Sequence, residues 1–131
     1  MGASYLMGAV LMAYSLPNGA MACEVSLTGH FVIDQDGVPS GAPNMQWDLI
    51  QDRNGAVTGS VILNSGGTGS VAGTASANGR GADLVVTWKS GGRGRYTWTL
   101  DQNGRMVSGQ TIALDAPGMS ARLSSSSSFC Q

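Results

Sequence analysis

Charged residues are scarce in this chain, and their shortage argues against several classes of function. Asp, Glu, Lys and Arg make up 11% of the 131 residues, whereas an average globular protein has about 25%. The formal net charge is −1, and among the seven Lys and Arg residues only Arg93 and Arg95 lie close together. Binding to nucleic acid depends on a concentrated basic face that neutralises phosphates. The composition therefore argues against a nucleic acid as partner.

Histidine and cysteine are too few for common hydrolytic and metal chemistry. His30 is the single histidine, so any Ser-His-Asp triad would have to include it. One histidine and two distant cysteines do not make a closed zinc site. The segment Asp34-Gln35-Asp36-Gly37 resembles the start of a calcium loop, but the later ligands are missing, so it predicts a turn. We expect no enzyme activity, no metal and no cofactor, and we expect His30 at the surface.

A membrane-spanning run is also missing. The apolar stretch from Tyr5 to Leu16 is shorter than the ~20 residues that cross a bilayer. Pro17 interrupts it, and Ala20-Met21-Ala22 has the small-x-small pattern of a cleavage site, although no basic residue precedes the stretch. We expect a signal peptide over residues 1–22, no membrane span, and a single secreted or periplasmic domain over residues 23–131. A buried N-terminal helix is the alternative.

Two cysteines, Cys23 and Cys130, stand near the ends of the expected mature chain. An even pair in an exported protein predicts a disulfide, which here would join the first segment to the last. A lipid on Cys23 is the main alternative, although Ala20-Met21-Ala22-Cys23 lacks the leucine that usually opens such signals. Two free thiols are the third possibility.

Helical periodicity is absent after residue 22, and alternation with a period of two takes its place. Clusters of Gly, Asn and Asp separate the alternating runs, and Asn54-Gly55 is a strong hairpin signal. The expected strands cover residues 30–34, 45–51, 57–63, 70–76, 83–90, 96–101, 106–114 and 120–129. Because closure removes two bare edges, we predict an all-β fold, an eight-stranded antiparallel up-and-down β-barrel. The longest connection, residues 37–44, is a plain linker or a flap over one mouth.

Alternation also predicts which side chains face the interior. The large aromatic residues expected there are Phe31, Trp47, Trp88, Tyr96 and Trp98. An eight-stranded barrel is just wide enough for its own side chains or for one small ligand. The aromatic residues therefore either fill the barrel or line an apolar cup. In the cup, Val61, Leu63 and Ile112 would form an apolar wall. Its polar groups would be the Tyr96 hydroxyl, Ser108 and Gln110.

Several strand motifs resemble those of the avidin and streptavidin family. They occur in family order as Ser26-Leu27-Thr28-Gly29-His30-Phe31, Asn54-Gly55-Ala56-Val57-Thr58-Gly59-Ser60, Val86-Thr87-Trp88-Lys89 and Tyr96-Thr97-Trp98. The resemblance implies a streptavidin-like or calycin-like barrel that holds biotin at one end. It also implies a possible homo-oligomer, because the family is often tetrameric.

The resemblance assigns residues to the pocket but alters its chemistry. Trp88 and Trp98 stand where tryptophans of the family pack on biotin. The residues that would replace the family's polar or capping residues are Ile33, Val61, Leu63, Ile112 and Ser127. A buried polar group without a partner costs ~1–3 kcal/mol. The resemblance therefore implies an altered or weak biotin site.

We expect a non-enzymatic barrel that binds a small, largely apolar ligand. Trp88, Tyr96 and Trp98 would contact the ligand, and the wall would be formed by Trp47, Val61, Leu63 and Ile112. The alternative is a protein-interaction module with a solid core, such as a protease inhibitor or an envelope-associated subunit. Its contacts would lie in the loops at residues 37–44 and 91–94. A third possibility is a degenerate family member with weak affinity for biotin.

Overall fold

The structure is a computed structural model that describes residues 22–36, 44–116, 118–125 and 127–131. The predicted signal peptide, apart from Ala22, and residues 37–43 of the longest connection lie outside this part of the chain. In the described part, no helix has the length and hydropathy that a membrane span requires.

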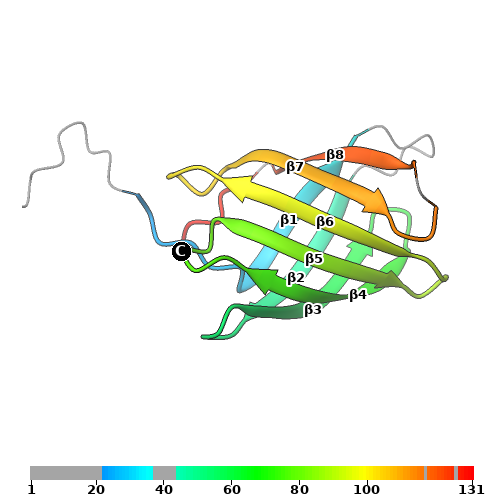
Figure 1. The fold of residues 1–131 in the computed structure, drawn as a ribbon, viewed down its shortest axis with the longest axis horizontal. Helices are drawn as coiled ribbons and strands as arrows, with labels where there is room; N and C mark the ends of the chain where they lie inside the picture. Colours follow the sequence, from blue (N-terminus) through cyan, green and yellow to red (C-terminus); the bar gives the residue numbers. More distant parts are fainter. Residues whose placement is uncertain (1–21, 37–43, 117, 126) are drawn as a thin grey trace, which may run out of the picture.

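Eight strands form one closed barrel in which each strand is antiparallel to the next (Figure 1). The ring closes where β8 pairs with β1. The strands are β1 (Gly29–Gln35), β2 (Asn44–Gln51), β3 (Ala56–Leu63), β4 (Thr68–Ala75), β5 (Gly81–Trp88), β6 (Arg93–Leu100), β7 (Met106–Ala113) and β8 (Ser120–Ser125). The predicted all-β, eight-stranded antiparallel up-and-down barrel is confirmed.

The predicted disulfide between Cys23 and Cys130 is also confirmed. Val25 pairs with Cys130 in an isolated antiparallel bridge, and the Gln131 N–H donates to the Glu24 carbonyl at 2.9 Å. The two ends of the described chain are thereby joined at one end of the barrel. We call it the closed end, and it also carries the β2–β3, β4–β5 and β6–β7 hairpins. The opposite end, with the β3–β4, β5–β6 and β7–β8 connections, is the mouth.

Asx turns shape the hairpins of the closed end. Asp52 Oδ1 accepts hydrogen bonds from the backbone N–H groups of Asn54 and Ala56, at 2.8 and 2.9 Å. Asp101 makes the same pair of contacts in the β6–β7 hairpin. Gly55 completes the first of these turns at a φ of 87°, a conformation that only glycine adopts without strain. Short polar side chains thus satisfy the turn backbone where no ladder continues.

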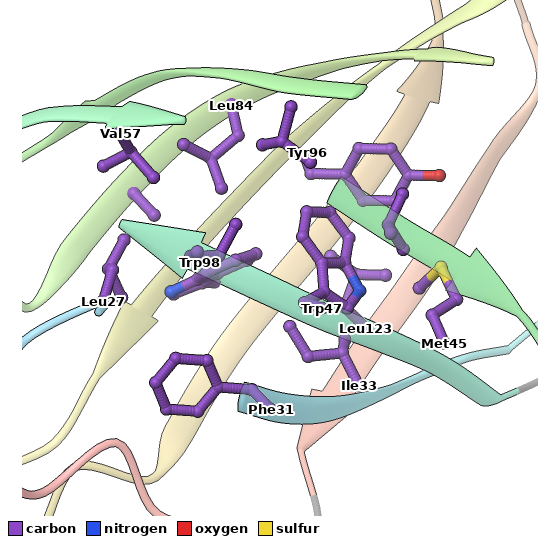
Figure 2. Packing of buried hydrophobic residues seen from close by; sticks show 14 of the residues in the cluster. Leu27, Phe31, Ile33, Met45, Trp47, Val57, Leu84, Tyr96, Trp98 and Leu123 are labelled. Atoms are coloured by element: carbon purple, nitrogen blue, oxygen red, sulfur yellow. The ribbon is translucent and has the colours of Figure 1, made fainter. Parts of the chain in front are cut away.

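The inward faces predicted for most strands are confirmed. Trp47, Val61 and Leu84 are fully buried, whereas their outward neighbours Asp48 and Ile62 are exposed. The buried hydrophobic residues of the core are Leu27, Phe31, Ile33, Met45, Trp47, Leu49, Val57, Val61, Val71, Ala82, Leu84, Val86, Tyr96, Trp98, Leu100, Leu123 and Phe129. Figure 2 shows these side chains converging from opposite walls of the barrel.

The inward face predicted for β7 is wrong. Ile112 is 41% exposed and Leu114 is 38% exposed, and Ser108 and Gln110 also lie on the outer face. The ladder between β6 and β7 shifts register at Thr99/Leu100. The apolar side chains at alternate positions of β7 suggested the wrong face, since beyond Met106, which packs against the core, the inward positions of this strand carry only Gly109, Thr111 and Ala113.

Two further expectations need correction at the ends of strands. The strand predicted for residues 120–129 ends at Ser125, and Phe129 instead turns into the core, where it is fully buried. The turn predicted at residues 34–37 is wrong for Gln35, which completes β1, and Asp34 lies in β1 as the strand predicted over residues 30–34 required. Gln35 pairs with Leu123 of β8, so closure of the barrel holds it in the sheet.

Candidate functional site

The closed end of the barrel is filled with aromatic and aliphatic side chains. The Phe31 and Phe129 rings stack with centroids 4.2 Å apart, and Trp98 lies 5.7 Å from Phe129. Leu27 is fully buried beside them. Arg80 seals the outside of this end, because its Nη2 donates to the Cys23 carbonyl at 2.7 Å. Packed side chains therefore occupy this end of the barrel.

The middle of the barrel is packed as well. The Trp47 ring meets the Tyr96 and Trp98 rings edge to face, with centroids 5.2 and 5.8 Å apart. Aromatic pairs at such angles and separations contribute about 0.5–1.5 kcal/mol beyond their buried area. Figure 2 shows Trp47 between Tyr96 and the Ile33–Leu123 side of the core. Trp47 and Trp98 are therefore core residues, and neither lines the expected cup.

A cavity remains at the mouth because the inward residues of β6, β7 and β8 become small there. Gly94, Ala113 and Ala121 line a cavity of about 310 Å³, which we call the mouth cavity. Its other lining residues are Gln35, Trp88, Gly92, Arg93, Tyr96, Thr111, Asp115, Ala116, Met119 and Ser120. The two large rings come from neighbouring strands, β5 and β6.

Glycines fix the two aromatic rings of the mouth cavity. A Cβ added at Gly69 would lie 2.9 Å from the Trp88 ring, and one added at Gly94 would lie 3.0 Å from the Tyr96 ring. The Trp88 ring therefore rests on the backbone of the adjacent strand β4, and the Tyr96 ring rests on the backbone of its own strand, two residues earlier. Close packing against backbone restricts the rotamers of Trp88 and Tyr96. The rings form a preformed apolar surface.

Three polar side chains meet at the inner wall of the mouth cavity. The Tyr96 hydroxyl lies 3.5 Å from Gln35 Oε1, and Thr111 is buried nearby on β7. Figure 2 shows this hydroxyl on the Met45 side of the core, away from Leu27. Burial raises the pKa of Tyr96, while hydrogen bonding to Thr111 and Trp88 partly opposes the rise. Tyr96 is thus a neutral phenol that can donate and accept a hydrogen bond.

One ion pair stands at the rim of the mouth cavity. Arg93 Nη2, at the start of β6, donates to Asp115 Oδ1 in the β7–β8 connection at 3.1 Å. The side chains of Arg93 and Asp115 are 54% and 48% exposed. The hydrogen bond from Arg93 lowers the pKa of Asp115, so both groups are charged at neutral pH. They are the only charged residues among the described residues that line the cavity.

The structure separates the predicted ligand-binding residues into three groups. Trp88 and Tyr96 line the mouth cavity, as the cup hypothesis required. The residues held in or against the core are Trp47, Val61, Trp98 and the half-buried Leu63. Ile112 and Ser127 are exposed. The Ser127 N–H donates a hydrogen bond to the Oγ of Ser125. Ser127 therefore belongs to a local turn.

Sequence analysis missed Gln35, Thr111, Arg93 and Asp115. Gln35 was assigned to a turn, and Thr111 to the outer face of β7. Arg93 and Asp115 lie 22 positions apart, and only the β6–β7 ladder brings them together. The sequence did contain one signal of the cavity, namely the small residues Gly94, Ala113 and Ala121. Small side chains at inward positions indicate a space that the core does not fill.

A larger hollow, of about 1060 Å³, crosses the outer surface of β4 to β8. Short polar residues such as Thr97, Thr99 and Ser108 line much of it, and the Thr99 and Ser108 hydroxyls are hydrogen-bonded at 2.6 Å. A ligand pocket usually encloses its ligand in apolar walls with a few polar groups. The mouth cavity fits that description better and is the candidate site.

No family model, curated protein or solved structure matches this chain. In the residues that the structure describes, no three His, Cys, Asp or Glu side chains come together in a way that could hold a metal ion.

Proposed function

We propose that this protein is a non-enzymatic binding protein whose mouth cavity holds one small aromatic ligand. The observation that carries the proposal is the pair of fixed rings, Trp88 and Tyr96, on a cavity of about 310 Å³. That volume is roughly twice the ~150 Å³ that accommodates benzene in an apolar protein cavity. One ring or two fused rings would fit between these walls.

The polar groups of the cavity favour a ring that carries a hydrogen-bonding substituent. Tyr96 and Thr111 each offer a hydroxyl, and Gln35 offers an amide oxygen. A ligand that left these buried groups without partners would lose ~1–3 kcal/mol for each. A phenol or an indole can make such bonds, whereas a plain hydrocarbon cannot.

A binding role without catalysis is supported by the position of the single histidine. His30 Nδ1 lies 2.7 Å from Asp48 Oδ1, and both side chains are more than half exposed on the outer face. An Asp–His pair needs a nucleophile on the other ring nitrogen to act in acyl transfer. The cavity lies at the mouth and is lined by neither residue.

Tight binding of biotin is not part of the proposal. Ile33 and Val61, which the avidin resemblance places at polar positions of the biotin site, are fully buried hydrocarbon side chains. They offer no hydrogen bond to a urea group. Membership of the avidin family remains a proposal, supported by the eight-stranded up-and-down topology and by Trp88 at one mouth.

Export of the protein is a further part of the proposal. A disulfide such as Cys23–Cys130 forms and persists in oxidising compartments, which include the periplasm and the extracellular space. A secreted or periplasmic location would also agree with the signal peptide predicted over residues 1–22.

The proposal is tested by calorimetric titration of the purified protein with phenol, indole and biotin. We expect saturable binding of the first two. Ala113→Leu should weaken their binding by about tenfold or more, because its larger side chain fills the cavity. Ala72→Leu is the matched control, since Ala72 is exposed on the outer face of β4, and it should bind as the parent does.

Two outcomes would count against the proposal. Absence of binding across aromatic compounds would favour the alternative of a protein-interaction module. Binding that Ala113→Leu leaves intact would place the ligand elsewhere on the barrel.

A further inference from the structure

The rim of the mouth cavity carries one positive and one negative group, and this pairing restricts the ligand further. Arg93 and Asp115 touch through a single contact of 3.1 Å. A guanidinium has five N–H donors and a carboxylate accepts through two oxygens, so most of the capacity of both groups remains for other partners. Both side chains are about half exposed and belong to the lining of the mouth cavity.

We infer that the ligand is a zwitterion, an aromatic α-amino acid being the simplest example. This inference rests on the proposed binding of an aromatic ring in the mouth cavity. The ring would lie against Trp88 and Tyr96, its carboxylate would bind Arg93, and its ammonium group would bind Asp115. The proposed ligand is therefore a compound with an aromatic ring and, outside the ring, one carbon that bears both an ammonium and a carboxylate group.

The spacing of the ion pair fits such a ligand. In an α-amino acid the ammonium and carboxylate groups are attached to the same carbon, so they lie a few ångströms apart. The Arg93–Asp115 contact of 3.1 Å sets its two charges at a similar separation. The two charges of the ligand and the two charges of the rim can then form a square in which neighbours have opposite signs. The ligand carboxylate lies next to Arg93, and the ligand ammonium group lies next to Asp115.

Ligands with a single charge fit the rim less well. An anion attracted by Arg93 would lie beside the Asp115 carboxylate, and a cation attracted by Asp115 would lie beside the Arg93 guanidinium. Like charges at this distance repel, which cancels most of the gain. Only a ligand with both charges gains from both rim residues.

Other features of the cavity agree with an aromatic amino acid. Its volume of about 310 Å³ suits one or two fused rings. Met119 lies at the rim, and thioethers make favourable contacts with aromatic rings. Gln35 Oε1 can accept a hydrogen bond from an indole N–H or a phenol O–H.

The test compares four compounds that share an indole ring. Calorimetry measures the affinities of 3-methylindole, L-tryptophan, L-tryptophan amide and N-acetyl-L-tryptophan. The amide lacks the carboxylate charge, and the N-acetyl compound lacks the ammonium charge. We expect L-tryptophan to bind about fivefold more tightly than either derivative, as expected of ion pairs at half-exposed positions.

Two variants assign the charges to residues. In Arg93→Gln the advantage of L-tryptophan over its amide should disappear, and in Asp115→Asn its advantage over the N-acetyl compound should disappear. Arg95→Gln is the control, because Arg95 pairs with Asp83 on the outer face and should leave both advantages unchanged.

The outcomes separate this inference from the proposed function. Binding of 3-methylindole with equal affinities for the three tryptophan compounds would overturn the inference and leave the binding role intact. Failure of all four compounds to bind would overturn both. Advantages that persist in Arg93→Gln and Asp115→Asn would show that other groups recognise the charges, which also contradicts the inference.

Discussion

At the scale of single residues, equally large side chains have different roles at the two ends of the barrel. Trp98 is 2% exposed and packs against Trp47 and Phe129. Trp88 is only half-buried and has one side on the mouth cavity. The position of a residue along the barrel axis, and not its type, therefore decides whether it stabilises the core or faces a ligand.

This difference predicts losses of stability of different size for two tryptophan substitutions. Trp98→Ala should lower the free energy of unfolding by about 3–5 kcal/mol, because it leaves a cavity in a packed core. Trp88→Ala should lower it by only about 1–2 kcal/mol, because part of the side chain is already in contact with water. Urea denaturation followed by circular dichroism measures both. Equal losses for the two variants would contradict the assignment of Trp88 to an open site.

A second prediction concerns the outer face, where Asp83 and Arg95 form a bidentate ion pair with contacts of 2.9 and 2.6 Å. The hydrogen bond from Arg95 lowers the pKa of Asp83 below its ordinary 3.8. A lowered native pKa means that the pair stabilises the fold above about pH 4 and that this stabilisation is lost as the pH falls through the native pKa.

Asp83→Asn removes that dependence. The variant should be slightly less stable than the parent at pH 7, and the difference in unfolding free energy should shrink towards zero as the pH falls below 3.8 and through the lowered native pKa of Asp83. Denaturation at a series of pH values measures the difference. A gap that widens in acid would mean that Asp83 is not stabilised as a carboxylate in the native barrel.

At the scale of the elements, alternation in the sequence was sufficient for most strands. In β2 the buried residues Met45, Trp47 and Leu49 alternate with exposed polar ones, so the pattern and the structure agree. In β7 the pattern failed, because Ile112 is exposed and the inward positions hold Thr111 and Ala113. A strand that lines a cavity can have small residues at its inward positions. The alternation of apolar and polar residues in its sequence is therefore weakest where the site lies.

The positions of residues near the ends of the strands also could not be predicted from the sequence. Phe129 follows a run of five serines, Ser124–Ser128, that gives no alternation to locate the end of the strand, and only the closed barrel shows that Phe129 fills the closed end. Arg93 and Asp115 belong to different elements, and no local pattern links them. The rings of Trp88 and Tyr96 and the Tyr96 hydroxyl were predicted for the site, whereas Gln35, Thr111, Arg93 and Asp115 were not.

The β6–β7 hairpin gives a prediction at this scale. Gly104 has a φ of +73°, and a Cβ there would lie 2.8 Å from the Cys130 nitrogen and 2.9 Å from its sulfur. Gly104→Ala should therefore destabilise the barrel by about 1–3 kcal/mol, through backbone strain together with the loss of close packing at the disulfide. Chemical denaturation measures the loss.

Gly66→Ala is the comparison for Gly104→Ala. Gly66 has a φ of +102° and nothing within 4 Å of an added Cβ, so its substitution tests backbone strain alone. The Gly104 variant should be the less stable of the two, although its φ is closer to the left-handed conformation that other residues can adopt. The reverse order would show that packing at the closed end is loose.

At the scale of the whole molecule, closure of the barrel depends on a short seam. Among the described residues, the β1–β8 ladder runs from Ile33 to Gln35, opposite Leu123 to Ser125, and the Asp36 N–H adds a hydrogen bond to the Arg122 carbonyl at 2.8 Å. The Cys23–Cys130 disulfide and the Val25–Cys130 bridge join the two ends of the described chain beyond that seam. The covalent link therefore supports one of the two shortest ladders of the ring, the other being that between β7 and β8.

Removal of the disulfide should destabilise the barrel. The double variant Cys23→Ser/Cys130→Ser should lose about 2–5 kcal/mol of unfolding free energy, because the link constrains the unfolded chain over a separation of 107 residues. Amide hydrogen exchange should accelerate most along β1 and β8 and least along β5 and β6. Uniform acceleration over all strands would contradict a weak seam.

The central claim is that the barrel is packed at its closed end and open at its mouth, with Trp88 as the tryptophan that meets the ligand. The indole N–H signals of the ¹⁵N-labelled protein test this claim most directly, because the chain has three tryptophans. Titration with unlabelled indole should shift the signal of Trp88 progressively and leave those of Trp47 and Trp98 nearly unchanged. Three unchanged signals, or larger shifts at Trp47 and Trp98 than at Trp88, would contradict the account.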